Sequence, residues 1–524
     1  MPKPESTGNA ILLRQEDNVA VAARRLEKGA QVALNGRTVV VSETINQGHK
    51  VAVATIRKGE PIRKYGQVIG FASADIAPGG WVHVHNVAVE KFDRDYAFCS
   101  ECPPEPRATE SRHFMGYERA DGRVGTRNYI ALVSTVNCSA STCRAVADRF
   151  RGDELREFPN VDGVFAITHK GGCGMQYGGP DHEQLDRTLA GFAKHPNVGA
   201  YILVGLGCET GQAGHLIEGQ DLVQIRMPGQ PVAIASDGKT RPKAITLQEC
   251  GGTPKTIDAL VRLIREMLPA VNDVRRTKQP ASKIVLGTNC GGSDGNSGIT
   301  ANPALGIASD MIVAQGGSSI LAETTEVYGA EHLLTRRAKS REIGQKLVDR
   351  IKWWEWYTSI FGADINNNPS VGNKEGGLTT IYEKSLGAVA KGGSAPLSGV
   401  FRYAEQVNVP GFVFMDTPGL DNVSVTGIVA GGANVVVFTT GRGSCFGCKP
   451  TPSIKVATNT PMYLHMIDDM DLNAGDVLEG ISLEQKGGEI FDKILAVAGG
   501  EKTKSELHGV GEEEFAPWPI GPTL

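Results

Sequence analysis

The stretch YILVGLGCE, residues 201–209, is an apolar run that ends in Gly-Leu-Gly and then in Cys208. Three other runs end in a similar way: YIALVSTVNC at Cys138, VFAITHKGGC at Cys173 and KIVLGTNC at Cys290. Short apolar runs rich in β-branched residues are typical of buried strands in parallel sheets. In open parallel sheets the ligand crevice lies beyond the carboxyl ends of the strands. The sequence therefore predicts a thiol at the crevice end of each of four strands.

Helix-like segments separate these runs. Between residues 116 and 278 the expected strands alternate with segments of helical periodicity, such as IDALVRLIREML, which starts at Ile257. After the polar break NDVRRTKQPASK, β runs such as GFVFMDT and ANVVVFTT alternate with the long helical pattern SREIGQKLVDRIKWWEWYTSIF. Such alternation favours parallel sheets with helices on both faces. We predict an α/β protein with two doubly wound α/β units, 116–278 and 279–524, the second ending in a polar, proline-rich surface tail.

The first part of the chain has a different pattern. Up to residue 92, apolar and polar residues alternate between glycine turns, as in AQVALNGRTVVVSETI and GWVHVHNVAVE. That pattern is typical of short strands in a small β domain. Residues 93–115 carry three prolines and many charges with few apolar residues. We therefore predict a β domain at residues 1–92, joined by a linker at 93–115 to the α/β region.

Composition excludes several classes of protein. The 524 residues are 40% hydrophobic and 21% charged, with a net charge of −4, which gives no electrostatic footprint for nucleic acid or for an anionic membrane. The start MPKPESTGNA lacks a basic segment followed by an apolar core, and no run approaches the roughly 18 apolar residues of a spanning helix. We expect a cytoplasmic protein without a membrane or nucleic-acid partner. Its ten cysteines are then thiols or metal ligands rather than disulfides.

The strand-end thiols are candidate metal ligands. Cys138, Cys173, Cys208 and Cys290 share one context, and three of them stand beside glycine. Thiolates are soft ligands that suit iron and iron-sulfur clusters. His169 stands four residues before Cys173 on the same expected loop and is compatible with the same metal. The alternative is that each cysteine packs as a small apolar residue, which is common at strand ends.

Two further cysteine pairs have zinc-like spacing. CSEC holds Cys99 and Cys102, and CFGC holds Cys445 and Cys448. Two such pairs can complete one structural zinc site, although these lie far apart in the sequence.

Three glycine-rich loops carry short polar or cationic side chains. They are CGGSDGNSGITANP, NNNPSVGNKEGG and TTGRGS. Such loops can present N–H groups and polar side chains to a carboxylate or a polyol; the alternative is a tight turn that requires glycine. No P-loop and no G-x-G-x-x-G fingerprint follows a first strand, which disfavours nucleotide binding. The candidate substrate-binding residues of these loops are Ser293, Asp294, Asn302, Asn373, Lys374 and Arg442.

Several longer motifs together resemble one family. GHKVAVATI and IRKYGQVIG in the β domain, GYERADGRVGTRNY, GLGCE, CGGSDGNSGITANP, NPSVGNKEGG, FTTGRGS and PSIKVATN stand in the same order as in the altronate/galactarate dehydratase family of sugar-acid hydro-lyases, and the resemblance covers nearly the whole chain. It implies a β-clip domain of the SAF type at the N-terminus and an iron-dependent removal of water from a hexonate or hexarate. HPNVGAYILVGLGCE, EVYGAEHLL and HVHNV are closer to altronate dehydratases, which convert D-altronate to 2-dehydro-3-deoxy-D-gluconate. The segment GSCFGCKPTPSIK departs from those relatives, which read Thr-Pro-Tyr-Gly there, and this puts the exact sugar acid in question.

The implied reaction needs a metal and a base. A metal binds the carboxylate and a hydroxyl as a Lewis acid, and a base removes the proton at C2. Mononuclear Fe(II) and a 4Fe-4S cluster both remain open, with Mn(II) as a substitute ion. His49 in QGHK is the first candidate base, and His85 in HVHN is the second, although His83 should share its face of the strand. Lys455 is a candidate second base or carboxylate anchor.

Five further residues are candidate ligands of the substrate or of the metal. Arg127 and Asn128 in GTRN open the first α/β strand, where the guanidinium could hold the substrate carboxylate in two hydrogen bonds. Glu209, Glu323 and Glu326 could ligate the metal or orient a histidine.

Alternative functions are a galactarate or other aldarate dehydratase, a related lyase that eliminates sulfite or another group, and a non-enzymatic iron-sulfur sensor. We also expect a homo-oligomer, most simply a dimer, that acts on a small sugar acid.

Overall fold

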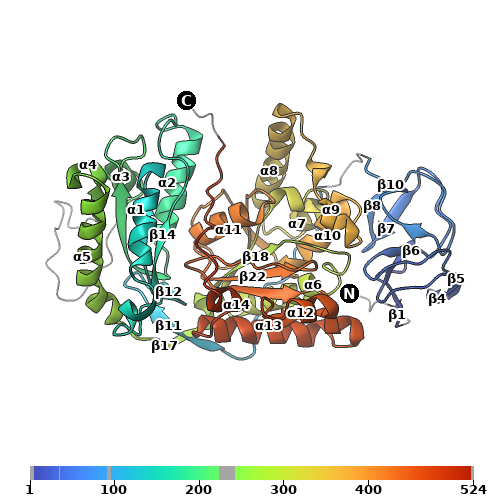
Figure 1. Ribbon diagram of the computed structural model, residues 1–524. Helices are drawn as coiled ribbons and strands as arrows, with labels where there is room; N and C mark the ends of the chain where they lie inside the picture. Colours follow the sequence, from blue (N-terminus) through green and yellow to red (C-terminus); the bar gives the residue numbers. More distant parts are fainter. Residues whose placement is uncertain (1–4, 7, 35, 91–95, 223–241, 521–524) are drawn as a thin grey trace.

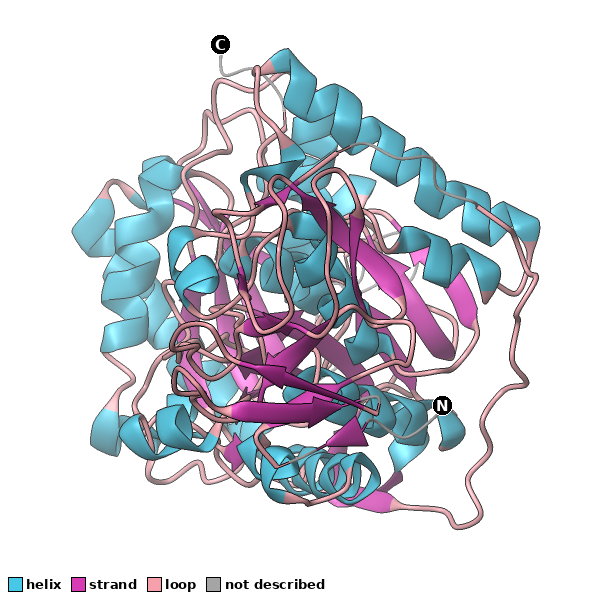
Figure 2. Cartoon of the chain, turned by 90° about the vertical axis from the view of Figure 1, so that its right-hand side faces the viewer, coloured by secondary structure: helices cyan, strands magenta, loops and turns pink. Residues whose placement is uncertain are grey.

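A computed structural model of the chain describes residues 5–6, 8–34, 36–90, 96–222 and 242–520. Figure 1 shows three bodies in a row: a β domain at one end, a large central α/β unit and a smaller α/β unit at the other end. Figure 2 looks onto the end formed by the β domain, with helices surrounding the sheets. This arrangement confirms the predicted class, an N-terminal β domain followed by α/β units with parallel sheets. Among the described helices, none is long and apolar enough to cross a membrane.

The N-terminal domain consists of short, mostly antiparallel strands arranged as β1-β2-β3-β6-β9, β10-β8-β7 and β4-β5. Their inward residues are small and β-branched, such as Val21 and Val51, which are almost fully buried. The strands are β1 (Glu5–Ser6), β2 (Ala10–Leu12), β3 (Val19–Ala22), β4 (Gln31–Leu34), β5 (Arg37–Val40), β6 (Lys50–Ala52), β7 (Pro61–Lys64), β8 (Gln67–Ala72), β9 (Trp81–Val82) and β10 (Val87–Ala88).

The smaller α/β unit is built on a four-stranded parallel sheet of order β14-β13-β15-β16. Its central strands are buried along their whole length because helices cover both faces, as continuous apolar runs require. The strand order reverses between β13 and β15. The elements are β13 (Tyr129–Ser134), α1 (Asn137–Asp148), β14 (Gly163–Ile167), α2 (Pro180–Ala193), β15 (Val198–Gly205), α3 (Ala213–Gly219), β16 (Lys243–Thr246), α4 (Leu247–Cys250) and α5 (Thr253–Asn272).

A small antiparallel sheet joins the two α/β units. It has the order β12-β11-β17 and contains β11 (His113–Glu118), β12 (Val124–Gly125) and β17 (Thr277–Pro280). Strand β11 thus begins inside the predicted linker 93–115, whose first residues, to 95, lie outside the described ranges. Strand β17 crosses the predicted boundary at residue 278. The connection between the units is therefore a paired sheet rather than a free hinge.

The central unit has a seven-stranded parallel sheet of order β20-β21-β19-β18-β22-β23-β24, which reverses between β18 and β22. Such a reversal point opens a crevice at the carboxyl ends of the two strands. The strands are β18 (Val285–Cys290), β19 (Ser318–Leu321), β20 (Leu397–Phe401), β21 (Gly411–Met415), β22 (Val435–Thr440), β23 (Ser453–Ala457) and β24 (Leu472–Asn473). The helices are α6 (Ala301–Ala314), α7 (Glu331–Arg336), α8 (Arg341–Ile360), α9 (Val371–Glu375), α10 (Ile381–Ala388), α11 (Asp421–Ala430), α12 (Thr460–His465), α13 (Leu483–Ala498) and α14 (Lys504–Leu507).

Apolar clusters cross the boundaries between these bodies. One cluster combines Ile56 and Ile69 of the β domain with Tyr382 and Phe412 of the central unit. A second spans both α/β units, where Gly191 in α2 lies so close to α11 that an added Cβ would be 2.4 Å from the Ala430 carbonyl oxygen. The three bodies are therefore packed into one molecule.

The C-terminal segment is more than the predicted surface tail. It contains α14, a buried Phe515, and Trp518, whose ring stacks on Trp354 with a centroid distance of 5.0 Å. The aromatic side chains of this segment pack against the α/β units, although its polar and proline-rich composition had predicted a surface tail. The last four residues, 521–524, lie outside the described ranges.

Candidate active site

Three thiols lie at one edge of the smaller parallel sheet. Cys138, Cys173 and Cys208 follow β13, β14 and β15, and all three side chains are exposed. Cys138 is the second residue of α1, whose first turn contains no acidic residue. We call this set the thiol edge.

Hydrogen bonds join the loops that carry the thiol edge. The N–H of Asn137 donates to the Gly171 carbonyl at 3.1 Å, and the N–H of Gly211 donates to the Gly172 carbonyl at 3.1 Å. Gly172 has a φ of 94°, and an added Cβ would lie 2.2 Å from the Thr135 carbonyl oxygen. Only glycine fits there. Glu209 braces the loop before Cys208, since its carboxylate accepts from the Thr135 hydroxyl at 2.8 Å.

His169 organises the thiol edge instead of adding a ligand to it. Its Nε2 lies 2.9 Å from the Ser134 carbonyl, and its Nδ1 accepts the N–H of Gly171 at 3.2 Å. Burial lowers the pKa of His169 to about 4, so the ring is neutral. Because both ring nitrogens are engaged by backbone, we do not retain His169 as a ligand.

Cys290 is separate from the other three thiols because β18 opens a different sheet. It is buried at the end of that strand, with Lys391 Nζ 2.9 Å from its Sγ. Among the described residues, Cys290, Glu323 and Glu326 form the one group of three potential ligands whose atoms all lie within 4.8 Å of one another. The expectation that one metal joins all four strand-end thiols therefore does not fit this geometry.

Two lysines already neutralise the carboxylates beside Cys290. Lys391 Nζ lies 2.7 Å from Glu323, and Lys384 Nζ lies 2.6 Å from Glu326. Burial raises the pKa of the Cys290 thiol to about 12, so it stays protonated. A metal at this group would have to displace two ammonium groups.

Glu323 has an unusual backbone conformation, and the neighbouring Asp421 has a raised pKa. Glu323 has a left-handed φ of 68°, which is rare for a residue with a side chain, and its buried Oε1 has no hydrogen-bond partner among the described residues. Asp421 lies nearby at the start of α11 and accepts from Asn289 Nδ2 at 3.0 Å. Burial, followed by the charges of Glu323 and Glu326, raises the pKa of Asp421 to about 7.

His49 places the β domain directly on the loops of the central unit. Its Nε2 lies 3.1 Å from the Glu375 carbonyl at the end of α9. The turn before it approaches two glycine loops so closely that an added Cβ on Gly295 or Gly377 would lie 1.9 or 2.5 Å from the Gly48 carbonyl oxygen. The glycine-rich loops thus serve as a docking surface for the turn that carries His49.

A buried ionic network holds this docking in place. Lys50 Nζ lies 2.8 Å and Lys64 Nζ 2.9 Å from the two carboxylate oxygens of Glu383, and all three side chains are almost fully buried. Lys50 also donates to the Gly377 carbonyl at 2.7 Å. Burial by itself would raise the pKa of Glu383, but Lys50 and Lys64 hold that pKa well below its usual value. Sequence reasoning missed this network, although a lysine inside the apolar strand KVAVA was a visible signal.

His83, rather than His85, accompanies His49. The rings of His49 and His83 are 5.0 Å apart, and His83 stacks on Trp81 at 5.0 Å. His83 is buried, and its Nδ1 has no hydrogen-bond partner within the described ranges, whereas His85 is exposed. Strand β9 ends at Val82, so the alternation that would place both histidines on one face stops there. Burial, then the charges of Lys50 and His49, lower the pKa of His83 to about 3.

Most polar residues of the glycine-rich loops are structural. Asp294 accepts hydrogen bonds from Asn296, Ser297, Thr458 and Asn459. Asn302 bonds the Gly387 carbonyl and the Thr439 hydroxyl, while Asn373 caps α9 and donates to the Ser293 carbonyl. The Ser293 hydroxyl itself is buried without a partner in the described part of the chain.

Two cations of these loops remain available to a ligand. Lys374 is half-buried and forms no ion pair with another described residue. Arg442 is half-exposed and only loosely paired with Glu375, at 3.4 Å. Both flank Gly376, whose added Cβ would lie 3.3 Å from Arg442 Cδ. Arg442 and His49 therefore both approach Glu375 of α9, from its carboxylate and from its carbonyl.

The loop 441–448 and the loop that carries Cys173 each contribute to one apolar cluster. Arg442 stands at one end, and Phe446 packs with Phe438 in the apolar cluster against which Met175 of the Cys173 loop also packs. Lys455 is buried beneath the loop and donates to the Phe446 carbonyl at 3.1 Å. Burial lowers the pKa of Lys455. Its position fits a support for the loop better than a base.

Arg127 and Asn128 are committed to the protein. Arg127 is fully buried and binds Glu506 of α14 through Nε at 2.6 Å and Nη2 at 2.8 Å, while Asn128 Nδ2 donates to the Asn160 and Val271 carbonyls. Both precede β13 and so lie at the opposite end of the sheet from the thiol edge. We do not retain either as a substrate ligand. The C-x-x-C cysteines are also absent from the group of close potential ligands in the described chain.

Family models and known relatives match this chain along nearly its whole length. Three family models match: the altronate/galactarate dehydratase SAF domain at residues 8–90, the D-galactarate dehydratase/altronate hydrolase second domain at 116–272, and the D-galactarate/altronate dehydratase C-terminal domain at 281–523. The chain is 34% identical to altronate dehydratase of Bacillus subtilis, over 98% of this chain and 99% of the relative. It is 36% identical to galactarate dehydratase (L-threo-forming) of Escherichia coli, over 97% of each chain. It is 32% identical to the (2R)-sulfolactate sulfo-lyase subunit beta of Chromohalobacter salexigens, over 78% of this chain and 97% of the relative. The chain therefore belongs to the altronate/galactarate dehydratase family.

Proposed function

We propose that this protein is a hydro-lyase that dehydrates a sugar acid, with D-altronate as substrate and 2-dehydro-3-deoxy-D-gluconate as product. The full-length similarity to altronate and galactarate dehydratases supports the reaction class. The observation that carries the proposal is that His49 and Arg442 both reach Glu375 of α9, His49 at its carbonyl (3.1 Å) and Arg442 at its carboxylate (3.4 Å), beside the point where the central sheet reverses. A base beside a cation is what removal of a proton next to a carboxylate requires.

The substrate carboxylate pairs with Arg442 and Lys374, which lack strong partners of their own. The guanidinium can hold a carboxylate through two parallel hydrogen bonds. The buried Ser293 hydroxyl, which has no partner among the described residues, is available to a sugar hydroxyl. These contacts place C2 and C3 of the acid between the His49 turn and the loop 441–448.

The chemistry then divides between two groups. His49 accepts the C2 proton, and the electron pair of that C–H bond forms the C2–C3 double bond as the C3–O bond breaks. The leaving hydroxyl takes a proton from the Asp421 carboxyl, whose pKa near 7 suits an acid that must also be reprotonated. Water leaves, and the resulting enol rearranges to the 2-keto acid. The proton balance is one taken at C2 and one returned at the leaving oxygen.

Iron is assigned to the thiol edge on the chemistry of its donors. Cys138, Cys173 and Cys208 are exposed thiols on loops that are hydrogen-bonded together, whereas the donors around Cys290 are already balanced by two lysines. A 4Fe-4S cluster is held by cysteine thiolates, so Cys138, Cys173 and Cys208 would be the residues that hold it here. Bound there, the iron would act as a Lewis acid toward substrate oxygens. A single Fe(II) or Mn(II) at Cys290, Glu323 and Glu326 is the alternative.

One experiment separates the reaction classes. Protein purified without oxygen is incubated with D-altronate, galactarate and (2R)-sulfolactate, and 2-keto acid and sulfite are measured together with iron and acid-labile sulfide. We expect keto acid from altronate and no sulfite. Keto acid from galactarate alone would show that galactarate, and not altronate, is the substrate. Sulfite from sulfolactate would show that the protein is a sulfo-lyase. An iron-sulfur protein without product from any of the three acids would favour a sensor.

A further inference from the structure

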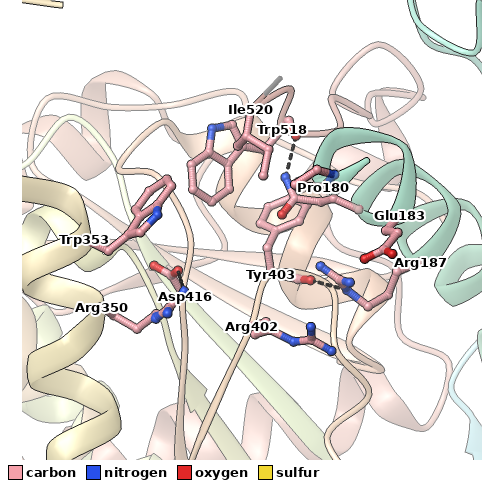
Figure 3. A pocket seen from close by; sticks show the side chains of 11 residues that line it. Pro180, Glu183, Arg187, Arg350, Trp353, Arg402, Tyr403, Asp416, Trp518 and Ile520 are labelled. Atoms are coloured by element: carbon pink, nitrogen blue, oxygen red, sulfur yellow. Dashed lines mark hydrogen bonds and ion pairs between the residues drawn. The ribbon is translucent and has the colours of Figure 1, made fainter. Parts of the chain in front are cut away.

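A cavity of about 170 Å³ lies outside the site described above, between the two α/β units. Figure 3 shows its lining: side chains from α2, from α8, from the segment after β20 and from the C-terminal segment face a common space. The cavity is smaller than the roughly 300–1,000 Å³ of a typical site for a drug-sized ligand, so it suits a small ion.

Positive charge dominates this cavity. Arg187, Arg350 and Arg402 line it and come from three separate segments. The carboxylates that line it are Glu183, which is exposed, and Asp416, which is buried. Three guanidinium groups thus share a narrow space with two carboxylates.

Asp416 is largely occupied by other partners. Its Oδ1 accepts from the Thr324 hydroxyl at 2.6 Å and from Trp354 Nε1 at 2.9 Å. Its Oδ2 is 3.7 Å from Arg350 Nη1, which is too long for a direct hydrogen bond. Asp416 therefore lowers the net charge of the cavity but does not satisfy the N–H groups of Arg350.

The other two arginines also keep unused donors. Arg187 donates through Nε to the Tyr403 carbonyl at 2.8 Å, and its two terminal NH2 groups form no hydrogen bond with another described residue. Arg402 approaches Glu405 only at 3.6 Å, and its side chain is 64% exposed. Burial, followed by repulsion from Arg402, lowers the pKa of Arg187. A guanidinium offers five N–H donors, so several on each arginine face the cavity or solvent.

The walls of the cavity are rigid and partly aromatic. Trp353, Tyr403 and Trp518 line it, and Gln184 fixes the C-terminal segment by donating to the Trp518 carbonyl at 2.6 Å. Tyr403 is buried, and its hydroxyl donates to the Val423 carbonyl at 2.8 Å. The arginines are therefore presented by packed elements of both α/β units rather than by a free loop.

From this geometry we propose that the cavity is a binding site for a small oxyanion, held by Arg187, Arg350 and Arg402 and distinct from the sugar-acid site. An oxyanion offsets the positive charge that three guanidinium groups leave in excess of two carboxylates, and it accepts several N–H bonds at once. Phosphate and short dicarboxylates share this chemistry. The site joins α2 of the smaller unit to α8 of the central unit, so the bound anion would brace the contact between the units.

The test uses the full-length protein and the fluorescence of Trp353 and Trp518, with inorganic phosphate and succinate as probes and chloride as the reference anion. We expect saturable binding of at least one probe in the wild type and none of chloride beyond an ionic-strength effect. Arg187→Gln and Arg402→Gln should each weaken binding by roughly 10- to 100-fold, which is the effect of losing one charged hydrogen bond. Arg265→Gln, on an exposed arginine of α5 outside the cavity, should bind like the wild type.

Three results would overturn the proposal: no saturable signal in the wild type, unchanged binding in both cavity variants, or displacement of the probe by the sugar acid in direct competition. Arg187→Lys keeps the charge but loses the planar donor set, and we expect it to bind more weakly than the wild type and more tightly than Arg187→Gln. Equal unfolding midpoints of Arg187→Lys and Arg187→Gln would show that the difference between them comes from the site. The test does not depend on which sugar acid the enzyme uses.

Discussion

Trp81 Nε1 lies 3.2 Å from Nδ1 of His49 and fixes the tautomer of that imidazole. An indole N–H can only donate and a carbonyl can only accept, so Nδ1 carries the lone pair and Nε2 donates to the Glu375 carbonyl at 3.1 Å. Burial lowers the pKa of His49, which keeps the ring neutral. For His49 to act as the base that we propose, Nδ1 would have to exchange the Trp81 N–H for the C2 proton of the substrate.

His49→Gln should lower turnover by about 10²–10⁴-fold, the usual range for loss of a general base. His85→Gln is the matched control, because His85 is exposed at the end of the same domain and should retain turnover close to that of the wild type. The measurement is kcat for the sugar acid in both variants. An equal loss of kcat in the two variants would contradict the assignment of His49, rather than His85, as the base.

Glu383→Gln should destabilise the folded protein by about 3–5 kcal/mol, because it leaves Lys50 and Lys64 buried without their counter-charge. Urea unfolding measures this change. Glu375→Gln, on an exposed carboxylate of α9, should change stability by no more than about 0.5 kcal/mol.

The same network predicts a dependence on acid. The folded-state pKa of Glu383 is depressed, so its contribution is present above its ordinary value of 4.5 and is lost as the pH falls below it toward the folded-state pKa. The wild type should lose stability over that acidic range more steeply than Glu383→Gln. Parallel curves would mean that the carboxylate contributes nothing through its ionisation.

Cys138→Ser, Cys173→Ser and Cys208→Ser should each lower bound iron and turnover by at least about tenfold, since a lost ligand weakens a metal site more than a lost outer partner does. Cys143→Ser is the control, because Cys143 is buried inside α1 and faces the core. Iron per chain, acid-labile sulfide and turnover are measured together. If the three variants keep their iron and Glu326→Gln loses it, the metal lies beside Cys290 instead.

Asp421→Asn should change the pH dependence of both activity and stability. The pKa of Asp421 is raised from 3.8 to about 7 in the folded protein, so the protonated carboxyl stabilises the fold. This stabilisation is lost as the pH rises from about 4 to about 7. The variant cannot ionise, so it should avoid the loss of stability that the wild type suffers between about pH 4 and pH 7. In a pH–rate profile, the limb near pH 7 should disappear. A limb that survives in Asp421→Asn belongs to another group.

Local pattern in the sequence determined much of this molecule. Apolar runs ending in glycine and cysteine predicted the strands before Cys138, Cys173 and Cys208, because the carboxyl ends of parallel strands meet at one edge. Glycine-rich text predicted the loops around the central crevice, and long motifs in a common order identified the family. These features depend on residues that are neighbours in the chain, which is why a sequence can reveal them.

Only the tertiary structure decided which of these residues meet. Cys290 shares the local context of the other thiols, but its strand starts a second sheet, and strand order is set by pairing between distant segments. His83 and His85 are separated in exposure by the end of β9, which breaks the alternation between them. Lys50 reaches Glu383 across 333 residues, and Arg127 is claimed by Glu506 across 379. A buried charge needs its partner at contact distance, and nothing in the local sequence states which distant segment will supply it.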